Sequence, residues 1–355
     1  MIAEECFSER WINDLRKRYP QASPQILEKA LHAFEVLGLL ARSRYPSVFK
    51  GGTALILLLP EVKRLSIDVD IIGDIPLNLL ADALPGTRFT GMEEDARKGA
   101  VPATHVKFFY QSLFVPAVNY VLVDMLRDDH PYLRVRDLPL RRDELFQTKE
   151  NFQVKIPSVE DILGDKLTAF APNTTGVLYG SGKSLEILKQ LFDVGELVTH
   201  ASAPDDIRST FDRVRSQQNG YRKTEFTVDD ILDDVLATSR QLCQIDFKGF
   251  VETSQTNELR AGMKAIHPYL LTERFSLPEA KLAASRAAFI AMVLKKHHRM
   301  VDLARLRFTA EKIEEIRNEQ LMGDLIAFNK LKRTNPEAFY YWWLVSKLQA
   351  GRQSS

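Results

Sequence analysis

The 355-residue sequence predicts an α+β fold, with a mixed β-sheet flanked by helices followed by an all-helical C-terminal domain. Segments rich in β-branched and aromatic residues lie between positions 47 and 156, whereas helical periodicity continues almost to the C-terminal end. Because a domain usually has about 100–200 residues, this length favours two domains. We expect them to be residues 1–202 and 203–355, divided near the ASAPDD stretch at 201–206.

Composition excludes several classes of protein. The 48 Lys and Arg residues nearly balance the 47 Asp and Glu residues, so any surface that attracts nucleic acid must be local. Cys6 and Cys243 are too few for a disulfide framework. The longest apolar run, residues 54–60, is far shorter than the roughly 20 residues that a membrane span needs. We therefore expect a soluble cytoplasmic protein with no membrane partner.

The N-terminal elements begin with an amphipathic helix over residues 23–41, whose apolar residues recur every three or four positions. A short strand at 47–50 then meets the glycine pair Gly51 and Gly52, which precedes an apolar helix at 53–59. Alternation of polar and β-branched residues predicts a strand at 66–73. By the same signals we expect further strands at 105–113, 118–126 and 152–156, and helices at 158–170, 184–200, 227–244, 278–299 and 309–322.

The glycine pair and the strand after it suggest chemistry. Free N–H groups at a helix start favour a bound anion. Asp68 and Asp70 lie two residues apart on one strand face, about 6.6–7 Å apart along the backbone. Carboxylate pairs of this kind hold Mg²⁺ against nucleotide phosphates, so phosphoryl or nucleotidyl transfer is the expected chemistry. The alternative for this pair is a polar strand edge that faces solvent.

Two runs carry a family resemblance. KGGTAL at 50–55 and RLSIDVD at 64–70 resemble the signature of the AbiEii/AbiGii nucleotidyltransferase toxins, a branch of the DNA polymerase β-like superfamily. The resemblance covers roughly residues 24–200 and implies that residues 1–202 form a nucleotidyltransferase-like catalytic domain. It implies an enzyme that transfers a nucleoside monophosphate from an NTP, with Mg²⁺ as cofactor and release of pyrophosphate. The residues that would bind nucleotide are Gly51, Gly52, Thr53, Arg64 and Ser66, with Asp68 and Asp70 on the metal.

Further matches lie downstream. Lys166 stands in the family's K-L-x-A context, and the resemblance implies that it binds phosphates of the nucleotide. Asp193, in a basic-x-x-x-Asp segment that starts at Lys189, would act as a later acidic residue of the site. The chain departs from the family at Gln190, where relatives usually carry an acidic residue. A solvated lysine at position 166 and an i,i+4 ion pair between Lys189 and Asp193 are the alternatives.

Other roles stay open at the level of sequence. For Arg64 the alternatives are binding phosphate and holding the carboxylates in place. For Ser66 they are contact with the nucleotide and packing against the turn. Asp124, on the expected strand at 118–126, is the candidate for a third metal-binding carboxylate. The aromatic run at 339–343 fits core packing better than base stacking.

The resemblance also bears on partners. It implies an RNA acceptor, with a tRNA 3′ end as the first expectation, and a separately encoded antitoxin protein. Basic groups that could contact an RNA backbone are Arg16 to Arg18, Arg42 with Arg44, Arg141 with Arg142, and Lys295 to Arg299. The rival readings are a nucleotidyltransferase that modifies small molecules, and a non-catalytic module that binds nucleotide or RNA.

Overall fold

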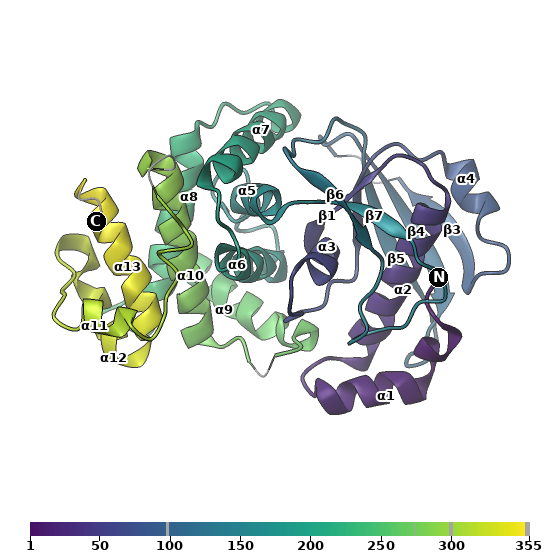
Figure 1. Cartoon of the computed structure of the whole chain (residues 1–355), viewed down its shortest axis with the longest axis horizontal. Helices are drawn as coiled ribbons and strands as arrows, with labels where there is room; N and C mark the ends of the chain where they lie inside the picture. Colours follow the sequence, from purple (N-terminus) through teal and green to yellow (C-terminus); the bar gives the residue numbers. More distant parts are fainter. Residues whose placement is uncertain (97–98, 273, 298–300, 352–355) are drawn as a thin grey trace. The chain divides into compact units, whose positions relative to one another are not determined.

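The computed structural model describes residues 1–96, 99–272, 274–297 and 301–351 (Figure 1). The chain forms two compact units: unit 1 is Met1–Ser158 with His267–Arg274, and unit 2 is Val159–Ile266 with Phe275–Ser355. Units therefore divide after Ser158, whereas we expected the catalytic domain to reach residue 202. The reason is packing, because helix α5 (Val159–Ala169) packs on α7 (Pro204–Arg222) and helix α6 (Ser184–Val198) packs on α10 (Leu277–Met292). The extent of the functional domain stays a prediction.

Unit 1 is built on a five-stranded mixed sheet with the order β1-β2-β5-β4-β3. Only β2 and β5 run parallel, while every other neighbouring pair is antiparallel. A separate hairpin pairs β6 with β7. The strands are β1 (Val48–Lys50), β2 (Val69–Ile72), β3 (Phe89–Asp95), β4 (Ala103–Gln111), β5 (Val118–Leu126), β6 (Val135–Pro139) and β7 (Gln153–Pro157).

One face of this sheet forms the core of unit 1. Helix α2 (Pro24–Arg42) packs against β2 and β5, as its apolar periodicity predicts. Val69 and Val123 on that face are fully buried, while Asp70 and Asp124 on the other face are half-buried. At the level of these residues the sheet thus has one apolar and one polar face, while Ile72, two positions after Asp70, is buried in a small cluster with Val48 and Tyr132. The remaining helices of unit 1 are α1 (Glu9–Arg18), α3 (Gly51–Leu58) and α4 (Leu77–Asp82).

Unit 2 is helical, and its described residues contain no strand. Besides α5 and α6, its helices are α7 (Pro204–Arg222), α8 (Val228–Gln244), α9 (Ser254–Ala265), α10 (Leu277–Met292), α11 (Lys312–Ile316), α12 (Leu331–Thr334) and α13 (Pro336–Gln349). Helix α10 lies at the centre of unit 2, where it packs against α6, α8 and α13. Among the described residues, no helix is long and apolar enough to cross a membrane.

Most predicted elements are confirmed within two or three residues, but the helix expected over 309–322 is wrong beyond α11. After two turn bonds, from the N–H of Arg317 to the carbonyl of Glu314 and from the N–H of Glu319 to that of Ile316, the backbone bonds to side chains. Asn329 both accepts from the N–H and donates to the carbonyl of Leu321, at 2.9 Å each, and Lys332 Nζ donates to the carbonyl of Glu319 at 2.7 Å. These side-chain bonds take the place of the backbone bonds that a helix through residue 322 would make.

Two further expectations concern the C-terminal part. The aromatic run at 339–343 lies on α13 and is buried throughout, which confirms core packing. The helix expected at 278–299 is α10 followed by a π-helical turn, Val293–His297, and its last two positions lie outside the described residues. Arg299, the end of one predicted basic group, also lies there.

Candidate active site

The glycine pair at the start of α3 packs directly against residues 64–70, the segment that leads into β2 and includes its first two residues. Gly51 has a left-handed backbone, with φ of +77°, and a Cβ atom there would overlap Oδ2 of Asp70. A Cβ atom on Gly52 would lie 2.8 Å from Nη2 of Arg64 and 2.9 Å from Oγ of Ser66. Both positions therefore require glycine because predicted site residues fill the space that a side chain would take.

Thr53, the next residue, joins the same arrangement. Its hydroxyl donates to the backbone carbonyl of Asp68 at 2.5 Å, and the side chain is fully buried. Positions 51, 52 and 53 thus each contact a residue of the 64–70 segment. Of the unit 1 residues with an expected contact to the nucleotide or the metal, the structure places Asp124 beside Asp70 on the neighbouring strand. It brings the others together around the turn: Gly51, Gly52, Thr53, Arg64, Ser66, Asp68 and Asp70.

Arg64 is buried, although arginine is seldom so enclosed without partners. Its Nη1 donates to the carbonyl of Leu65 at 2.9 Å. A distant segment supports this stretch, since Arg64 forms an antiparallel bridge with Leu270 and the Leu65 N–H donates to the carbonyl of Tyr269 at 2.7 Å. The predicted helical domain therefore contributes a short strand-like segment to unit 1. Sequence reasoning missed this contribution, because a single bridge has no periodicity to detect.

Asp70 belongs to a row of polar residues that crosses the sheet. Residues that pair across neighbouring strands share a face, and each register partner in this row is charged or ionisable. The register places Asp70 directly beside Asp124 on β5. The full row is Lys50, Asp70, Asp124, His105 and Asp95.

Asp124 has a specific partner in this row. Nδ1 of His105 lies 2.5 Å from Oδ1 of Asp124, so the imidazole and the carboxylate form a close hydrogen bond. Sequence reasoning singled out Asp124 but missed His105, whose role depends on strand register. In the described part of the chain, no group of three or more His, Cys, Asp or Glu side chains is arranged to hold a metal ion. The third carboxylate therefore stays a prediction.

The donors that are present fit a hard cation such as Mg²⁺. Asp68 and Asp70 supply carboxylate oxygens, and Mg²⁺ in nucleotide sites commonly takes one or two carboxylates and completes its shell with phosphate oxygens and water. The glycine turn lies against Asp70, and its backbone N–H groups suit phosphate. The carboxylate of Asp70 beside this turn, with Asp68 two positions before it, matches that ligand set.

Lys29 is a site neighbour that the sequence did not reveal. Burial lowers the pKa of this lysine, and the negative charge of Asp68 opposes that shift. Lys29 lies on α2, far from Asp68 in sequence, and helical periodicity says nothing of which strand residue it meets. A positive charge close to one of the two site carboxylates follows from the packing of α2 on the sheet.

Lys166 and Asp193 meet in unit 2. Nζ of Lys166 lies 2.9 Å from Oδ2 of Asp193 and donates to Oε1 of Gln190, also at 2.9 Å. Both charged residues are buried, at 8% and 2% exposed, so Lys166 is not a solvated surface lysine. Gln190, the departure from the family pattern, completes this network. Asp193 therefore pairs with Lys166, which lies 27 positions earlier on another helix.

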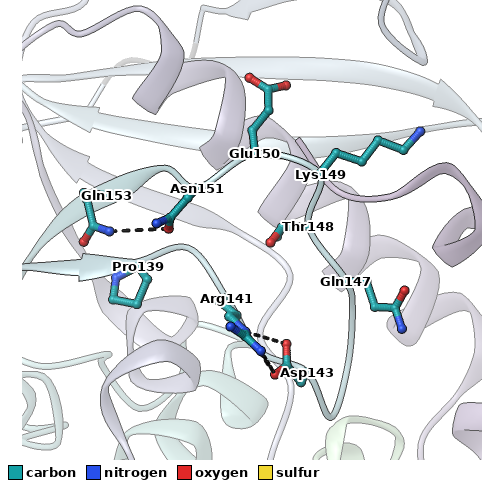
Figure 2. Close-up of a pocket in the computed structure, with 9 residues that line it drawn as sticks. All are labelled: Pro139, Arg141, Asp143, Gln147, Thr148, Lys149, Glu150, Asn151 and Gln153. Atoms are coloured by element: carbon teal, nitrogen blue, oxygen red, sulfur yellow. Dashed lines mark hydrogen bonds and ion pairs between the residues drawn. The ribbon is translucent and has the colours of Figure 1, made fainter.

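Unit 1 also has a cavity of about 970 Å³ between the hairpin strands and residues 147–151. Figure 2 shows its polar lining, with Arg141 paired to Asp143 at one end and Gln153 bonded to Asn151 at the other. None of the predicted site residues except Arg141 from the basic groups lines it. This cavity is separate from the set of residues around the glycine turn.

Comparisons with known proteins show the family of this chain. The family model of the nucleotidyl transferase AbiEii toxin, of type IV toxin–antitoxin systems, matches residues 39–265. The search of curated proteins found no match. The nucleotidyltransferase toxin MenT4 from Mycobacterium tuberculosis H37Rv has a similar structure, with a TM-score of 0.53, 13% identity and coverage of 96% of this chain and 99% of its own. JHP933 from Helicobacter pylori has a TM-score of 0.46, 15% identity and coverage of 82% and 99%.

The likeness to MenT4 supports the fold, an α+β unit followed by helices. The family model carries the identification, because it spans more than half of the chain and includes the glycine turn, both site aspartates, Lys166 and Asp193. This chain therefore belongs to the AbiEii nucleotidyltransferase toxin family and is a nucleotidyltransferase of the toxin–antitoxin kind.

Proposed function

We propose that this toxin transfers a nucleoside monophosphate from a Mg²⁺-bound NTP to a hydroxyl group of RNA, with the 3′ end of tRNA as the first candidate acceptor. The observation that carries the proposal is the packing of Gly51 against Asp70. That contact sets backbone N–H groups, which suit phosphate, beside a carboxylate, which suits a hard cation.

Each residue has a proposed task. The N–H groups of Gly51 and Gly52 bind phosphate oxygens, Asp68 and Asp70 hold the ion, and Arg64 adds a guanidinium that can bind phosphate through two N–H groups. When bound, Mg²⁺ neutralises phosphate charge and orients the triphosphate. The acceptor hydroxyl attacks the α-phosphorus, the bond to the bridging oxygen breaks, and pyrophosphate leaves with its electron pair.

The remaining site residues position the groups that bind the metal and the phosphates, or add to them. Thr53 fixes the backbone of Asp68 through its hydroxyl, and Ser66 packs where it limits the space beside Gly52. In this proposal Lys166 binds phosphate of the nucleotide, with Asp193 and Gln190 holding its ammonium group in place. Asp124 supplies a third carboxylate with His105 as its partner.

Local charge supports an RNA acceptor. Arg16, Lys17 and Arg18 are all exposed on the last turn of α1, and Arg42 with Arg44 is exposed after α2. Several members of the predicted basic groups already have partners: Lys17 pairs with Asp14, Arg141 with Asp143 and Lys295 with Asp233. Arg142 donates to the carbonyls of Leu59 and Pro60 at 2.9 and 2.8 Å, so its task is to hold the end of α3.

The toxin family implies an antitoxin, and we propose that a separately encoded protein neutralises this chain in the cell. The rival acceptor is a small hydroxylated molecule such as an aminoglycoside. An enzyme that modifies such a molecule would use the same metal site but would need no basic surface around it. The other rival, a module that binds nucleotide or RNA without turnover, would retain the family fold and transfer nothing.

One assay separates these readings. The purified protein is incubated with each of four α-³²P-labelled NTPs and Mg²⁺ or EDTA, and with either total tRNA or an aminoglycoside. We expect label on tRNA, only with Mg²⁺, and none with Asp68→Asn. Asp74→Asn is the matched control, because Asp74 follows β2, is exposed and pairs with Arg127 at 3.0 Å. Label on the aminoglycoside alone, or on neither acceptor, would contradict the proposal.

A further inference from the structure

An exposed aromatic ring lies on the polar face of the sheet, four positions before Asp124 on the same strand. Tyr120 on β5 is 38% exposed, whereas Val121 and Val123, which point to the opposite face of the strand, are fully buried. The strand period therefore puts Tyr120 on the same face as Asp124. An exposed tyrosine on a sheet face is a surface on which a flat ligand can stack.

The ring is braced on one side and flanked by cations. Phe109, its register partner on β4, meets it edge to face, with ring centroids 6.2 Å apart. Nζ of Lys29 lies 4.8 Å from the centre of the Tyr120 ring, and Nζ of Lys107 lies 5.3 Å from it. We call these four residues, Tyr120, Phe109, Lys29 and Lys107, the Tyr120 platform.

The two lysines differ in how they are held. Lys107 is paired with Asp95 at 3.1 Å, which fixes it beside the ring. Lys29 lies closer to the ring, and the acidic group whose charge acts on its pKa is Asp68. Lys29 thus links the platform to a site carboxylate. A lysine over an exposed ring is a weak contact, which a stacked base can replace while the ammonium group turns to a phosphate.

The strand order says what the platform is placed to bind. The glycine turn follows β1 on one side of β2, and β5 with Tyr120 lies on the other side. In an in-line displacement the attacking hydroxyl approaches opposite the leaving pyrophosphate. If the glycine turn holds the triphosphate, the acceptor approaches from the side of β5, across the Tyr120 platform.

We propose that the Tyr120 platform binds the terminal nucleotides of a single-stranded RNA acceptor, with a base stacked on Tyr120 and the lysines at the backbone phosphates. The proposal rests on the proposed transferase function and specifies its acceptor subsite. A sequence-tolerant stack with flanking positive charge is the way in which single-stranded nucleic acid is commonly held. The glycine turn and the platform then bind the two substrates on opposite sides of Asp68 and Asp70.

A binding experiment tests the platform without turnover. Fluorescence anisotropy measures the Kd of a 5′-fluorescein octaribonucleotide that ends in CCA-3′, in Mg²⁺ and without NTP. We expect Tyr120→Ala to weaken binding about tenfold or more, and Tyr120→Trp to retain it. Tyr45→Ala is the matched control and leaves Kd unchanged, because Tyr45 is 37% exposed and precedes β1, whose first residue pairs with Ile72 at the other end of β2.

Salt dependence tests the cations. For single strands, each neutralised phosphate contributes about 0.7 to the slope of log K against log salt, so Lys29→Met should lower that slope by roughly this amount. Unchanged binding by Tyr120→Ala, or no binding of the oligonucleotide by the wild-type protein, would overturn the platform.

The experiments distinguish failure of the Tyr120 platform from failure of the proposed transfer to RNA. If the wild-type protein and Tyr120→Ala transfer label to RNA with the same KM for RNA, the platform is wrong and the transferase stands. A rise in the KM for NTP alone also overturns it, since the ring would then hold the incoming nucleotide. If the oligonucleotide binds through Tyr120 but no label is transferred to any RNA, the platform stands and the proposed transfer to RNA fails.

Discussion

A Cβ atom on Gly51 would overlap a carboxylate oxygen of Asp70, so the turn and the acidic strand are fitted to each other at this one point. The same glycine has φ of +77°, which disfavours any L side chain. Two independent constraints, space and backbone conformation, therefore require glycine here. The contact also explains why a glycine pair and an acidic pair that lie apart in sequence belong to one site.

Replacing Gly51 should damage both stability and activity. Gly51→Ala adds overpacking of about 1–3 kcal/mol to a left-handed strain of about 1–2 kcal/mol, and it pushes Asp70 out of position. Urea unfolding and the transfer assay measure the two effects. Gly86→Ala is the control, because Gly86 has φ of +79° with nothing within 4 Å of its Cβ position. We expect Gly86→Ala to lose only the strain and to keep activity; equal losses in both variants would show that Asp70 is not displaced.

The bond between His105 and Asp124 tests the third carboxylate. If Asp124 assists the metal, His105→Ala should lower kcat/KM about tenfold or more, as the loss of a partner to a ligating group typically does. Asp124→Asn should cost at least as much. The double variant should then lose little beyond Asp124→Asn, because both changes act through one carboxylate.

His130→Ala is the control for that series, since His130 is exposed and stacks on Tyr132. Full activity in Asp124→Asn would remove Asp124 from the site. Additive losses in the double variant would give His105 a separate role.

The buried pair of Lys166 and Asp193 separates a structural role from a catalytic one. Lys166→Met leaves the Asp193 carboxylate buried without its cation, which typically costs about 3–5 kcal/mol, whereas Lys166→Met with Asp193→Leu removes both charges and should recover most of that stability. If Lys166 binds nucleotide, the double variant stays inactive although it is stable. Recovered activity would make the pair structural.

The matched control for this series is Arg317→Ala in unit 2. Arg317 pairs with Glu314 at 2.5 Å, and both side chains are more than 60% exposed. Exposed pairs contribute about 0–1 kcal/mol, so urea unfolding should register little change.

His32 predicts how stability depends on pH. Burial lowers the pKa of this histidine to about 4, its Nδ1–H donates to the carbonyl of Glu28 at 2.8 Å, and the nearby charge of Arg88 lowers the pKa further. The unfolded chain binds the proton more readily than the folded one. The contribution of His32 is therefore fully present above about pH 6.5 and is lost as the pH falls toward 4, by up to about 3 kcal/mol.

Urea unfolding of the wild-type protein and of His32→Phe at pH 7 and pH 5 checks this sign. The phenyl ring can still stack on Tyr110, whose ring centroid lies 3.6 Å from that of His32. We expect the wild-type protein to lose more stability than the variant between the two pH values. An equal loss in both would mean that His32 does not titrate in this window.

Local patterns in the sequence predicted much of the site. Alternation placed Asp68 and Asp70 on one face, and the burial of Val69 and Ile71 confirms that the strand has two unlike faces. The glycine turn followed by a helix is confirmed at α3. These features depend on residues within a few positions of one another, which is the range over which periodicity and turn chemistry act.

Other parts of the site depend on contacts between distant segments. The bridge between Arg64 and Leu270, the partner that His105 provides for Asp124, and the approach of Lys29 to Asp68 are set by strand register and helix packing. No local pattern specifies which of many buried positions will meet. For the same reason the helix expected beyond α11 is wrong, since side chains from later residues take its backbone groups.

The most direct test of nucleotidyl transfer is mass spectrometry of RNA from cells that make this protein, compared with cells that make the Asp68→Ala, Asp70→Ala double variant at the same level. Transfer to RNA predicts at least one RNA species whose mass rises by one or more nucleotides in the wild-type sample and is unchanged with the double variant. Identical RNA masses in the two samples would contradict it.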